Sequence, residues 1–344
     1  MAGYVLVGKK GGVNSNSCGN TPVSDAPILR LSLAPATGRA PPRRLHNIVQ
    51  HPAPRHWLML AYLSLFWGLA FYLIAVALRG FPPLTVVWLR LLVGAGVLYM
   101  IMRWQGGRLP MEGAWWIRFV LLSLCGNLLP FSLISWGQTR ITSGQAGLLM
   151  ALMPISTVLL AHFYVAHEQL TSRRLLGIGL GFIGVAVLVG TEALREFGGA
   201  QLLGQLAVLA ATLSYAVNSV YTKRLPPINT LVVSAASLIA GTVVLLPLVL
   251  LVDRPWTLQP GADAWFAAIA LGVFSTGLAT WVYFKVVSDC GPGFLSIINY
   301  LIPGIAFIAG ILFLGESARA TQFVGLVVIL LGIGLSQPRR KKRY

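Results

Sequence analysis

From residue 57 to residue 336 the chain alternates between long apolar runs and short polar segments. A helix that spans a bilayer needs roughly 17–25 mainly apolar residues. Runs of this length are predicted to be ten transmembrane helices at residues 57–78, 84–102, 115–136, 143–164, 174–190, 202–221, 229–252, 263–286, 292–314 and 320–336. The polar segments between them leave almost no room for a soluble domain. The pattern therefore predicts an all-α integral membrane protein.

One motif occurs twice: an apolar run, a glutamate, and then a glycine-rich apolar run. The two glutamates are Glu168 and Glu316, and the glycine-rich runs follow them at the same distance. This period is far longer than that of a solenoid. It predicts two repeats of five helices each, over residues 57–190 and 202–336. Because five is an odd number, the repeats would insert with opposite orientation, which is the architecture of alternating access.

Charge supports this arrangement. The chain is 56% apolar and only 10% charged, whereas a soluble domain carries about a quarter charged residues. With the N-terminus inside, the cytoplasmic loops would hold most of the basic residues, namely Arg103, Arg108, Arg118, Arg173, Arg174, Lys223, Arg224 and Lys285. This positive-inside bias predicts that both termini are cytoplasmic. It accounts for the net charge of +17 without a nucleic-acid partner, and membrane lipid is the expected surrounding.

The two ends of the chain differ from the rest. Residues 1–56 are rich in Gly, Pro, Ser, Asn and Arg and have no hydrophobic period, so we predict a disordered cytoplasmic segment. Residues 337–344 form a basic cytoplasmic tail.

Arg90 is the one charge predicted to lie well inside a span. Its cost at the bilayer centre is at least about 2.5–3.5 kcal/mol, which favours a position facing a cavity or a partner. The alternative is that the side chain snorkels toward the membrane surface, and the two are weighed equally.

Other polar and aromatic residues within the spans are candidates for a substrate pathway. Amides in hydrocarbon need several hydrogen-bond partners, although contacts between helices would satisfy them too. With Arg90, the candidates are Trp67, Asn127, Trp136, Tyr215, Asn218, Trp281, Asn299 and Tyr300.

Matched interruptions mark the fourth helix of each repeat. Pro154 and Pro303 are predicted to kink these helices mid-span, and paired breaks of this kind point to the binding region of a duplicated transporter. Glu168 and Glu316 follow at helix ends. We expect each carboxylate to accept backbone hydrogen bonds from the N-terminus of the next helix rather than to carry protons.

The sequence resembles the EamA-type family of the drug/metabolite transporter superfamily. The resemblance covers about residues 57–336 and rests on Phe66-Trp67-Gly68, Pro83…Trp88-Leu89-Arg90, Pro154…Glu168 and Pro303…Gly315-Glu316. His167 and Tyr215 depart from the pattern, which usually has Gly and often Trp there. The resemblance implies a ten-helix carrier in the cytoplasmic (inner) membrane, with a central cavity between the halves. Many such carriers export amino acids, metabolites or drugs.

The leading hypothesis is a secondary carrier, and probable exporter, of a small organic solute. An exchanger or a facilitative permease without ion coupling is the main alternative, because no clear ionisable residue other than Arg90 lies in mid-membrane. A membrane-embedded enzyme, a channel and a non-transporting subunit are less favoured. His162 and His167 fit a metal site poorly, and the sequence predicts neither a metal nor a cofactor. An aromatic cavity would favour cations and Arg90 a carboxylate, so the substrate stays open, as do the direction and the oligomeric state.

Overall fold

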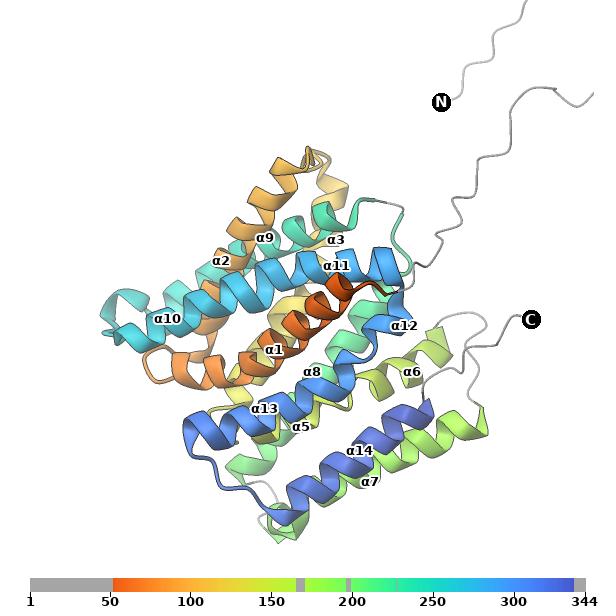
Figure 1. Ribbon diagram of the computed structural model, residues 1–344. Helices are drawn as coiled ribbons and strands as arrows, with labels where there is room; N and C mark the ends of the chain where they lie inside the picture. Colours follow the sequence, from red (N-terminus) through yellow and green to blue (C-terminus); the bar gives the residue numbers. More distant parts are fainter. Residues whose placement is uncertain (1–51, 165–170, 196–198, 227, 337–344) are drawn as a thin grey trace, which may run out of the picture. The chain divides into compact units, whose positions relative to one another are not determined.

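The computed structural model describes residues 52–164, 171–195, 199–226 and 228–336. Over these residues the chain is helical and contains no strand (Figure 1). The prediction of an all-α protein is therefore confirmed. The basic tail, Glu168, His167 and all but the last residues of the predicted N-terminal segment lie outside the described residues.

The first half begins at Pro54, where a proline starts the first helix without losing a helical hydrogen bond. Its elements are α1 (Pro54–Ala77), α2 (Pro83–Trp104), α3 (Gly113–Ser123), the π-helical turn η1 (Leu124–Leu128), α4 (Leu129–Gly137), α5 (Ser143–Met150), α6 (Met153–Tyr164) and α7 (Ser172–Arg195).

The second half has the same order of segments. Its elements are α8 (Ala200–Thr222), α9 (Thr230–Leu248), the π-helical turn η2 (Val249–Asp253), the 3-10 turn η3 (Pro255–Thr257), α10 (Ala262–Ala270), the π-helical segment η4 (Leu271–Leu278), α11 (Ala279–Cys290), α12 (Pro292–Leu295), α13 (Ile298–Leu314) and α14 (Ala320–Ser336).

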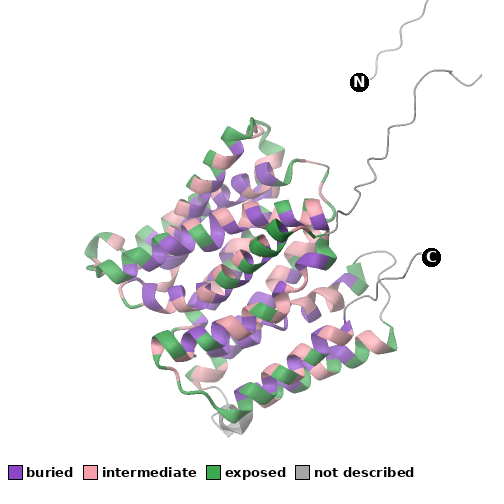
Figure 2. Cartoon of the chain, viewed as in Figure 1, coloured by how far each residue is buried: buried purple, intermediate pink, exposed green. Residues whose placement is uncertain are grey.

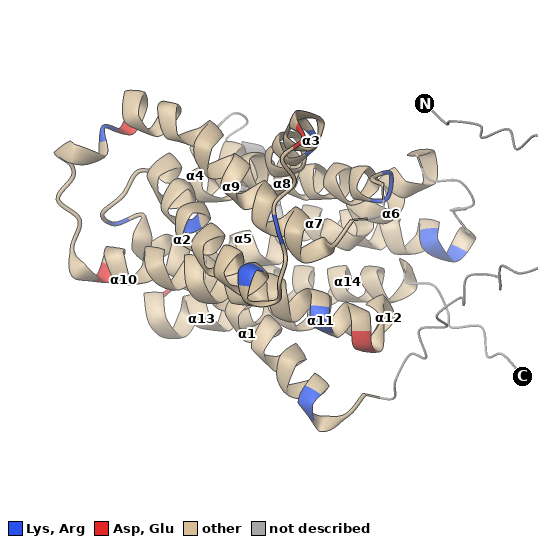
Figure 3. Cartoon of the chain, turned by 90° about the horizontal axis from the view of Figure 1, so that it is seen from above, with Lys and Arg blue, Asp and Glu red and all other residues tan. Residues whose placement is uncertain are grey.

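Eight helical segments of the described chain are long and apolar enough to cross a membrane, and α14 is a shorter apolar helix of 17 residues. Many large apolar side chains along them are exposed, as with Leu58, Phe266 and Leu312, which are 73%, 70% and 69% exposed. Figure 2 shows exposed residues on most of the helices. Charged side chains are few and lie mostly in loops and near helix ends (Figure 3). An apolar exterior of this kind requires lipid, so this is a membrane protein.

The two halves are interleaved. Helix α1 packs on α13, α2 on α9 and η4, α4 on α8, and α7 on α14. Figure 1 shows the α7–α14 pair side by side. Most of the extensive helix–helix contacts thus join the first half to the second. A polar residue on one half can therefore meet a partner on the other, which matters for the site.

Glycines permit the closest of these approaches. A Cβ on Gly177 of α7 would lie 2.6 Å from the Gly332 carbonyl oxygen, and a Cβ on Gly325 would lie 2.9 Å from that of Gly184. A side chain would force the two backbones apart. The glycine steps of the two helices therefore form packing faces, and the two faces meet each other.

Helix interruptions occur at corresponding places in the two halves. The π-helical segments η1 and η4 interrupt the third span of each half, and short breaks at residues 151–152 and 296–297 interrupt the fourth. Pro303 lies inside α13 as expected. Pro154, however, is the second residue of α6 rather than a mid-helix residue, so in the first half the kink is a break between two helices.

Candidate functional site

A cavity of about 270 Å³ lies among helices of both halves, near the middle of their length. Seven of the residues predicted from the sequence line it: Trp67, Arg90, Asn127, Pro154, Tyr215, Asn299 and Pro303. They come from α1, α2, η1 and α6 in the first half and from α8 and α13 in the second. Seven residues far apart in sequence are thus brought together at one place.

The lining is built from paired positions. Trp67 and Tyr215 are separated by the same number of residues as Glu168 and Glu316, and both face the cavity. Three further pairs of lining residues have this separation: Asn127 with Ser275, Ala151 with Asn299, and Pro154 with Ile302. The two halves therefore contribute equivalent parts of their helices to one cavity.

Arg90 is held inside the bundle and does not snorkel. It is 7% exposed, its Nε donates a 2.8 Å hydrogen bond to Oγ1 of Thr276, and its Cζ lies 3.7 Å from the ring centroid of Phe131. Thr276 Oγ1 in turn donates to the Leu271 carbonyl at 2.9 Å, a bond of the π-helical segment η4. These contacts fix the plane of the guanidinium and tie α2 to the opposite half.

Side chains of α1 hold η4 in place. The Trp67 indole N–H donates to the Ser275 carbonyl at 3.1 Å, and Ser275 Oγ donates to the Phe66 carbonyl at 2.8 Å. The Tyr62 hydroxyl donates to the Phe274 carbonyl at 2.9 Å. A π-helical segment departs from the regular α-helical ladder and is often found at a functional site. Here its carbonyl groups are paired with α1, which fixes one wall of the cavity.

Two side-chain amides face the cavity without a protein partner. Asn127 on η1 and Asn299 on α13 line it, and within the described chain neither amide makes a hydrogen bond to another residue. Each amide has two donors and an acceptor with two lone pairs. In a membrane interior such groups need a partner, and water or a solute in the cavity is the partner that the geometry allows.

Four predicted residues lie outside the lining. Trp136 is 37% exposed and stacks on Arg140, whose Cζ lies 3.6 Å from the ring centroid. Asn218 packs against Gly126, where an added Cβ would lie 2.7 Å from its Nδ2. Trp281 and Tyr300 pack against buried apolar clusters.

Glu316 binds the other half of the protein. Its Oε1 accepts from the Ser143 N–H at 2.7 Å and its Oε2 from the Gly144 N–H at 2.9 Å. The carboxylate therefore does cap a helix N-terminus, but that of α5 and not that of the following helix α14. We call the place where α5 begins and α13 ends the Ser143 end of the bundle.

A second carboxylate makes a similar contact at the Ser143 end. Asp253, the last residue of η2, accepts from both the N–H and the Oγ1 of Thr85, at 2.8 and 2.7 Å. Thr85 lies in the first turn of α2, where N–H groups have no partner within the helix. At this end, then, two acidic residues of the second half cap two helices of the first.

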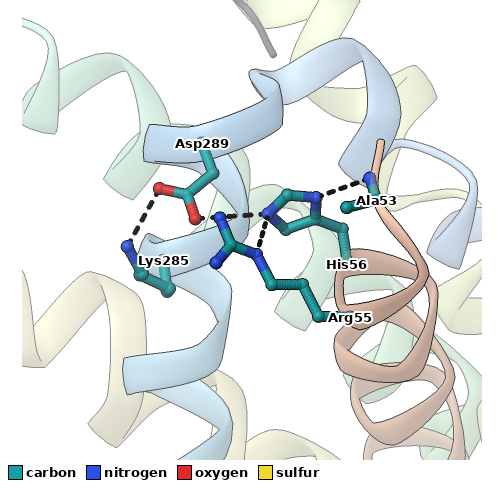
Figure 4. A network of polar contacts seen from close by, with 5 residues as sticks. All are labelled: Ala53, Arg55, His56, Lys285 and Asp289. Atoms are coloured by element: carbon teal, nitrogen blue, oxygen red, sulfur yellow. Dashed lines mark hydrogen bonds and ion pairs between the residues drawn. The ribbon is translucent and has the colours of Figure 1, made fainter. Parts of the chain in front are cut away.

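The opposite, or His56, end is joined by a different cluster, drawn in Figure 4. Asp289 on α11 lies 3.3 Å from Nε2 of the fully buried His56 on α1 and 3.1 Å from Nζ of Lys285. The Ala53 N–H donates to His56 Nδ1 at 3.0 Å. In the neutral imidazole this places the proton on Nε2, which then donates to Asp289. Arg55 Nε lies 3.2 Å from the same nitrogen, but in this tautomer Nε2 carries a proton and cannot accept from it.

The cavity carries little titratable chemistry. Of the residues that line it, only Arg90 and Tyr215 are titratable, and no acidic side chain is among them. Within the described parts of the chain, no three His, Cys, Asp or Glu side chains form a group that could hold a metal ion. The arrangement is that of a site that binds a molecule through one fixed positive charge, amides and aromatic faces.

Comparison with known proteins identifies the family of this chain. The profile of the EamA-like transporter family matches this chain twice, at residues 55–190 and 202–336. The chain belongs to the EamA-like transporter family. Each match covers one of the two halves.

Individual relatives are also named as transporters. The chain is 28% identical to the uncharacterized transporter YoaV of Bacillus subtilis, over 80% of this chain and 95% of that protein. It is 28% identical to a probable terminal-alkyne amino-acid exporter of Streptantibioticus cattleyicolor, over 79% and 90%. It is 22% identical to the uncharacterized inner membrane transporter YedA of Escherichia coli K12, over 79% and 87%.

One solved crystal structure shares the fold. It aligns with a TM-score of 0.61 at 20% sequence identity, over 82% of this chain and 97% of that chain. At this identity the likeness concerns the fold alone.

Ser275, Thr276 and Phe131 also line the cavity, but the sequence did not predict them as site residues. The duplication contained the signal for Ser275, which occupies the position equivalent to Asn127. Projecting Asn127 onto the second half would have found it. The position equivalent to Thr276 is the apolar Leu128, so the duplication gives no signal there. Phe131 carries no such signal, because a phenylalanine within an apolar span is ordinary.

Proposed function

We propose that this EamA-like protein is a secondary transporter that moves a small organic solute, such as a metabolite, an amino acid or a drug-like molecule, by alternating access. One observation carries the proposal: the cavity is lined by paired positions of the two halves. In an inverted-repeat transporter the binding site lies at the repeat interface, and equivalent residues would face the solute from both sides.

The proposed topology has ten spans arranged as two inverted five-helix repeats, with both termini cytoplasmic. The 24-residue helix α7 and the 17-residue helix α14 would complete the set. The basic residues of alternate loops support this orientation. Export is the proposed direction, and it is supported by the relative from Streptantibioticus cattleyicolor, which is named as a probable exporter.

A second candidate is exchange or facilitated movement without ion coupling. The lining favours it over proton antiport, because no carboxylate or histidine of the described chain lies in the cavity. Proton relays in membranes are built from such groups. Coupling through Arg90 alone would require the guanidinium to lose its proton, and an arginine side chain in a protein keeps its proton.

Flux in proteoliposomes tests the proposal. Purified protein would be assayed for uptake and efflux of labelled amino acids, other organic acids and lipophilic cations, with and without a pH gradient. Faster release in the presence of solute on the far side, with no response to pH, is the result expected for an exchanger. A response to the gradient would favour coupled carriage. Absence of flux for every solute would contradict a carrier.

Bridging each end of the bundle tests alternating access. In a background with the native cysteines replaced, Thr85→Cys with Asp253→Cys can be bridged at the Ser143 end, and His56→Cys with Asp289→Cys at the His56 end. Each bridge should stop flux, and reduction should restore it. Flux that continued with both ends bridged would contradict alternating access, and the four single-cysteine variants are the controls.

A further inference from the structure

The Arg90 guanidinium has no counter-ion in the protein as far as the structure describes it. Apart from the bond from Nε to Thr276, it makes no hydrogen bond, and it makes no ion pair with any described residue. A charge buried in a bilayer-spanning bundle normally pairs with an opposite charge or with several acceptors. This one is left with a single hydroxyl.

The acidic residues whose side chains the structure describes are all placed elsewhere. Asp253 binds Thr85, Glu316 binds the start of α5, and Asp289 binds Lys285. Glu112 and Asp263 are exposed at the starts of α3 and α10. None of them lines the cavity, so the positive charge of Arg90 is available to a molecule inside it.

The geometry of Arg90 leaves one edge of the guanidinium for such a molecule. Its Nε donates to Thr276. One face of the guanidinium lies on the Phe131 ring, with Cζ 3.7 Å from the ring centroid. Because Arg90 lines the cavity, the two Nη groups are the donors that remain. They form a planar fork that matches the two oxygens of a carboxylate.

The rest of the lining limits what the carboxylate can be attached to. The surroundings are mainly apolar and aromatic, with Trp67, Phe71, Ile74 and Ile302 among them. The volume of about 270 Å³ is slightly below the roughly 300–1,000 Å³ of pockets for drug-sized ligands. No acidic side chain of the lining could neutralise a cationic group. The partner-free amides of Asn127 and Asn299 suit an additional neutral polar group.

We propose that the cavity takes a compact monocarboxylate with an apolar body, and that the Nη edge of Arg90 binds its carboxylate. This inference rests on the proposed transport function and gives the substrate class of the same cavity. It decides between the two expectations from the sequence: the aromatic residues line a site for an anion and not for a lipophilic cation.

An acid and its carboxamide provide the test, because they differ in charge but hardly in size. Binding to detergent-purified protein would be measured by calorimetry, and counterflow in proteoliposomes, for 3-phenylpropanoate, 3-phenylpropanamide, leucine and leucinamide. The wild type should prefer each acid over its amide by on the order of tenfold to a hundredfold. Arg90→Gln should abolish this preference while leaving the weak binding of the amides unchanged, which also shows that the variant is folded.

Two further variants separate charge from geometry. Arg90→Lys keeps the charge but lacks the planar fork, so it should retain only part of the preference. Thr276→Val frees Nε while keeping Arg90, and it should weaken acid binding less than Arg90→Gln does. Arg103→Gln is the matched control on the same helix, because Arg103 is exposed and bonds only to the nearby Gly107 carbonyl; it should behave as wild type.

Each outcome is informative. Equal handling of acid and amide by the wild type, or an acid preference that survives in Arg90→Gln, would overturn the carboxylate site. Counterflow of neutral or cationic solutes with no binding of acids would overturn it too, and would leave the carrier intact. Acid-specific, Arg90-dependent binding without counterflow of any solute would retain the site and refute the transport function. No binding and no flux of any probe would count against both.

Discussion

Replacement of Glu316 by glutamine is expected to weaken the contact between the two halves at the Ser143 end. The carboxylate accepts from two N–H groups of α5, at 2.7 and 2.9 Å, with one oxygen for each. A carboxamide offers a single oxygen and turns an NH₂ group toward the second N–H. One charge-assisted bond is therefore lost, and so is the interaction of the negative charge with the helix N-terminus.

The magnitude follows from these two losses. A hydrogen bond to a charged group contributes about 1.5–3 kcal/mol, and a charge near a helix end about 0.3–1 kcal/mol. Because Glu316 is only half buried, solvent screens part of the effect and the lower values apply. We expect Glu316→Gln to reduce the free energy of unfolding by about 2 kcal/mol. If the contact exists only when this end is closed, the same energy shifts the closed–open equilibrium by about 30-fold.

Two assays measure these quantities. Unfolding would be followed by tryptophan fluorescence during titration with sodium dodecyl sulfate in mixed micelles. Opening would be followed in proteoliposomes through alkylation of Thr280→Cys, a cavity position, by a membrane-impermeant reagent applied from either side. Faster labelling from the side of the Ser143 end is expected. Glu112→Gln is the control, because Glu112 stands at the start of α3 and caps no N–H group.

A substitution at Gly310 should displace the Glu316 carboxylate without changing its charge. A Cβ on Gly310 would collide with Oε2 of Glu316 and lie 3.0 Å from Ser143 Oγ, so Gly310→Ala should displace the carboxylate and destabilise the protein. Gly304→Ala on the same helix meets no atom within 4 Å and should be neutral or slightly stabilising. Unfolding energies and labelling rates that stay at wild-type values in both Glu316→Gln and Gly310→Ala would refute the reasoning.

Three further outcomes are expected. Asn299→Ala should reduce the flux rate severalfold without changing membrane insertion or thermal stability. The substitution removes an amide from the cavity but breaks no hydrogen bond within the described protein. Flux at the wild-type rate would show that Asn299 is not part of the site. Gly332→Leu should destabilise the protein by about 1–3 kcal/mol through overpacking against Gly177, measured by the same titration. Asp289→Asn should weaken the His56 end by about 1 kcal/mol and speed labelling from that side, whereas equal labelling from both sides would contradict a role there.

The sequence predicted the positions of the eight long apolar helical segments of the described chain well, because a bilayer demands long apolar runs and a break in polarity marks each end. It did not predict the internal interruptions η1 and η4. A π-helical segment needs no particular residue type, and Asn127 and Ser275 fit a regular helix equally well. The breaks at 151–152 and 296–297 were located only approximately, through the nearby prolines, since a proline constrains its own preceding turn and not the path of the whole segment.

Residues of the candidate site could be predicted where a polar or charged side chain stands within an apolar span. Arg90, Asn127 and Asn299 are costly in hydrocarbon, and all three line the cavity. Aromatic residues were a weaker guide. Trp67 lines the cavity while Trp136 stacks on Arg140 at the exposed surface, because an aromatic ring is equally stable against lipid, another helix or a solute. The direction a ring faces is set by helix rotation, which a sequence pattern defines poorly.

Side-chain partners across the two halves were not predicted from the sequence. The expectation for Glu316 was a bond to the helix that follows it, the nearest in sequence, but its partner α5 belongs to the other half. Local reasoning fails here because the halves interleave, so that the end of α13 lies beside the start of α5 and not of α14. The duplication itself could have indicated this, since inverted repeats place like segments on opposite sides of a shared interface.

The asymmetry of the cavity has a mechanistic consequence. Paired lining residues such as Trp67 and Tyr215 would present similar surfaces to the solute whichever half is in the open conformation. Arg90 has no such counterpart, because the equivalent position of the second half is the buried Leu238. The bond from Arg90 to Thr276 crosses between the halves, so any rearrangement of α2 against η4 moves the fixed charge relative to the rest of the lining. Affinity for an anion should therefore differ between the two open conformations, and a bound anion should shift the equilibrium toward the conformation that binds it more tightly.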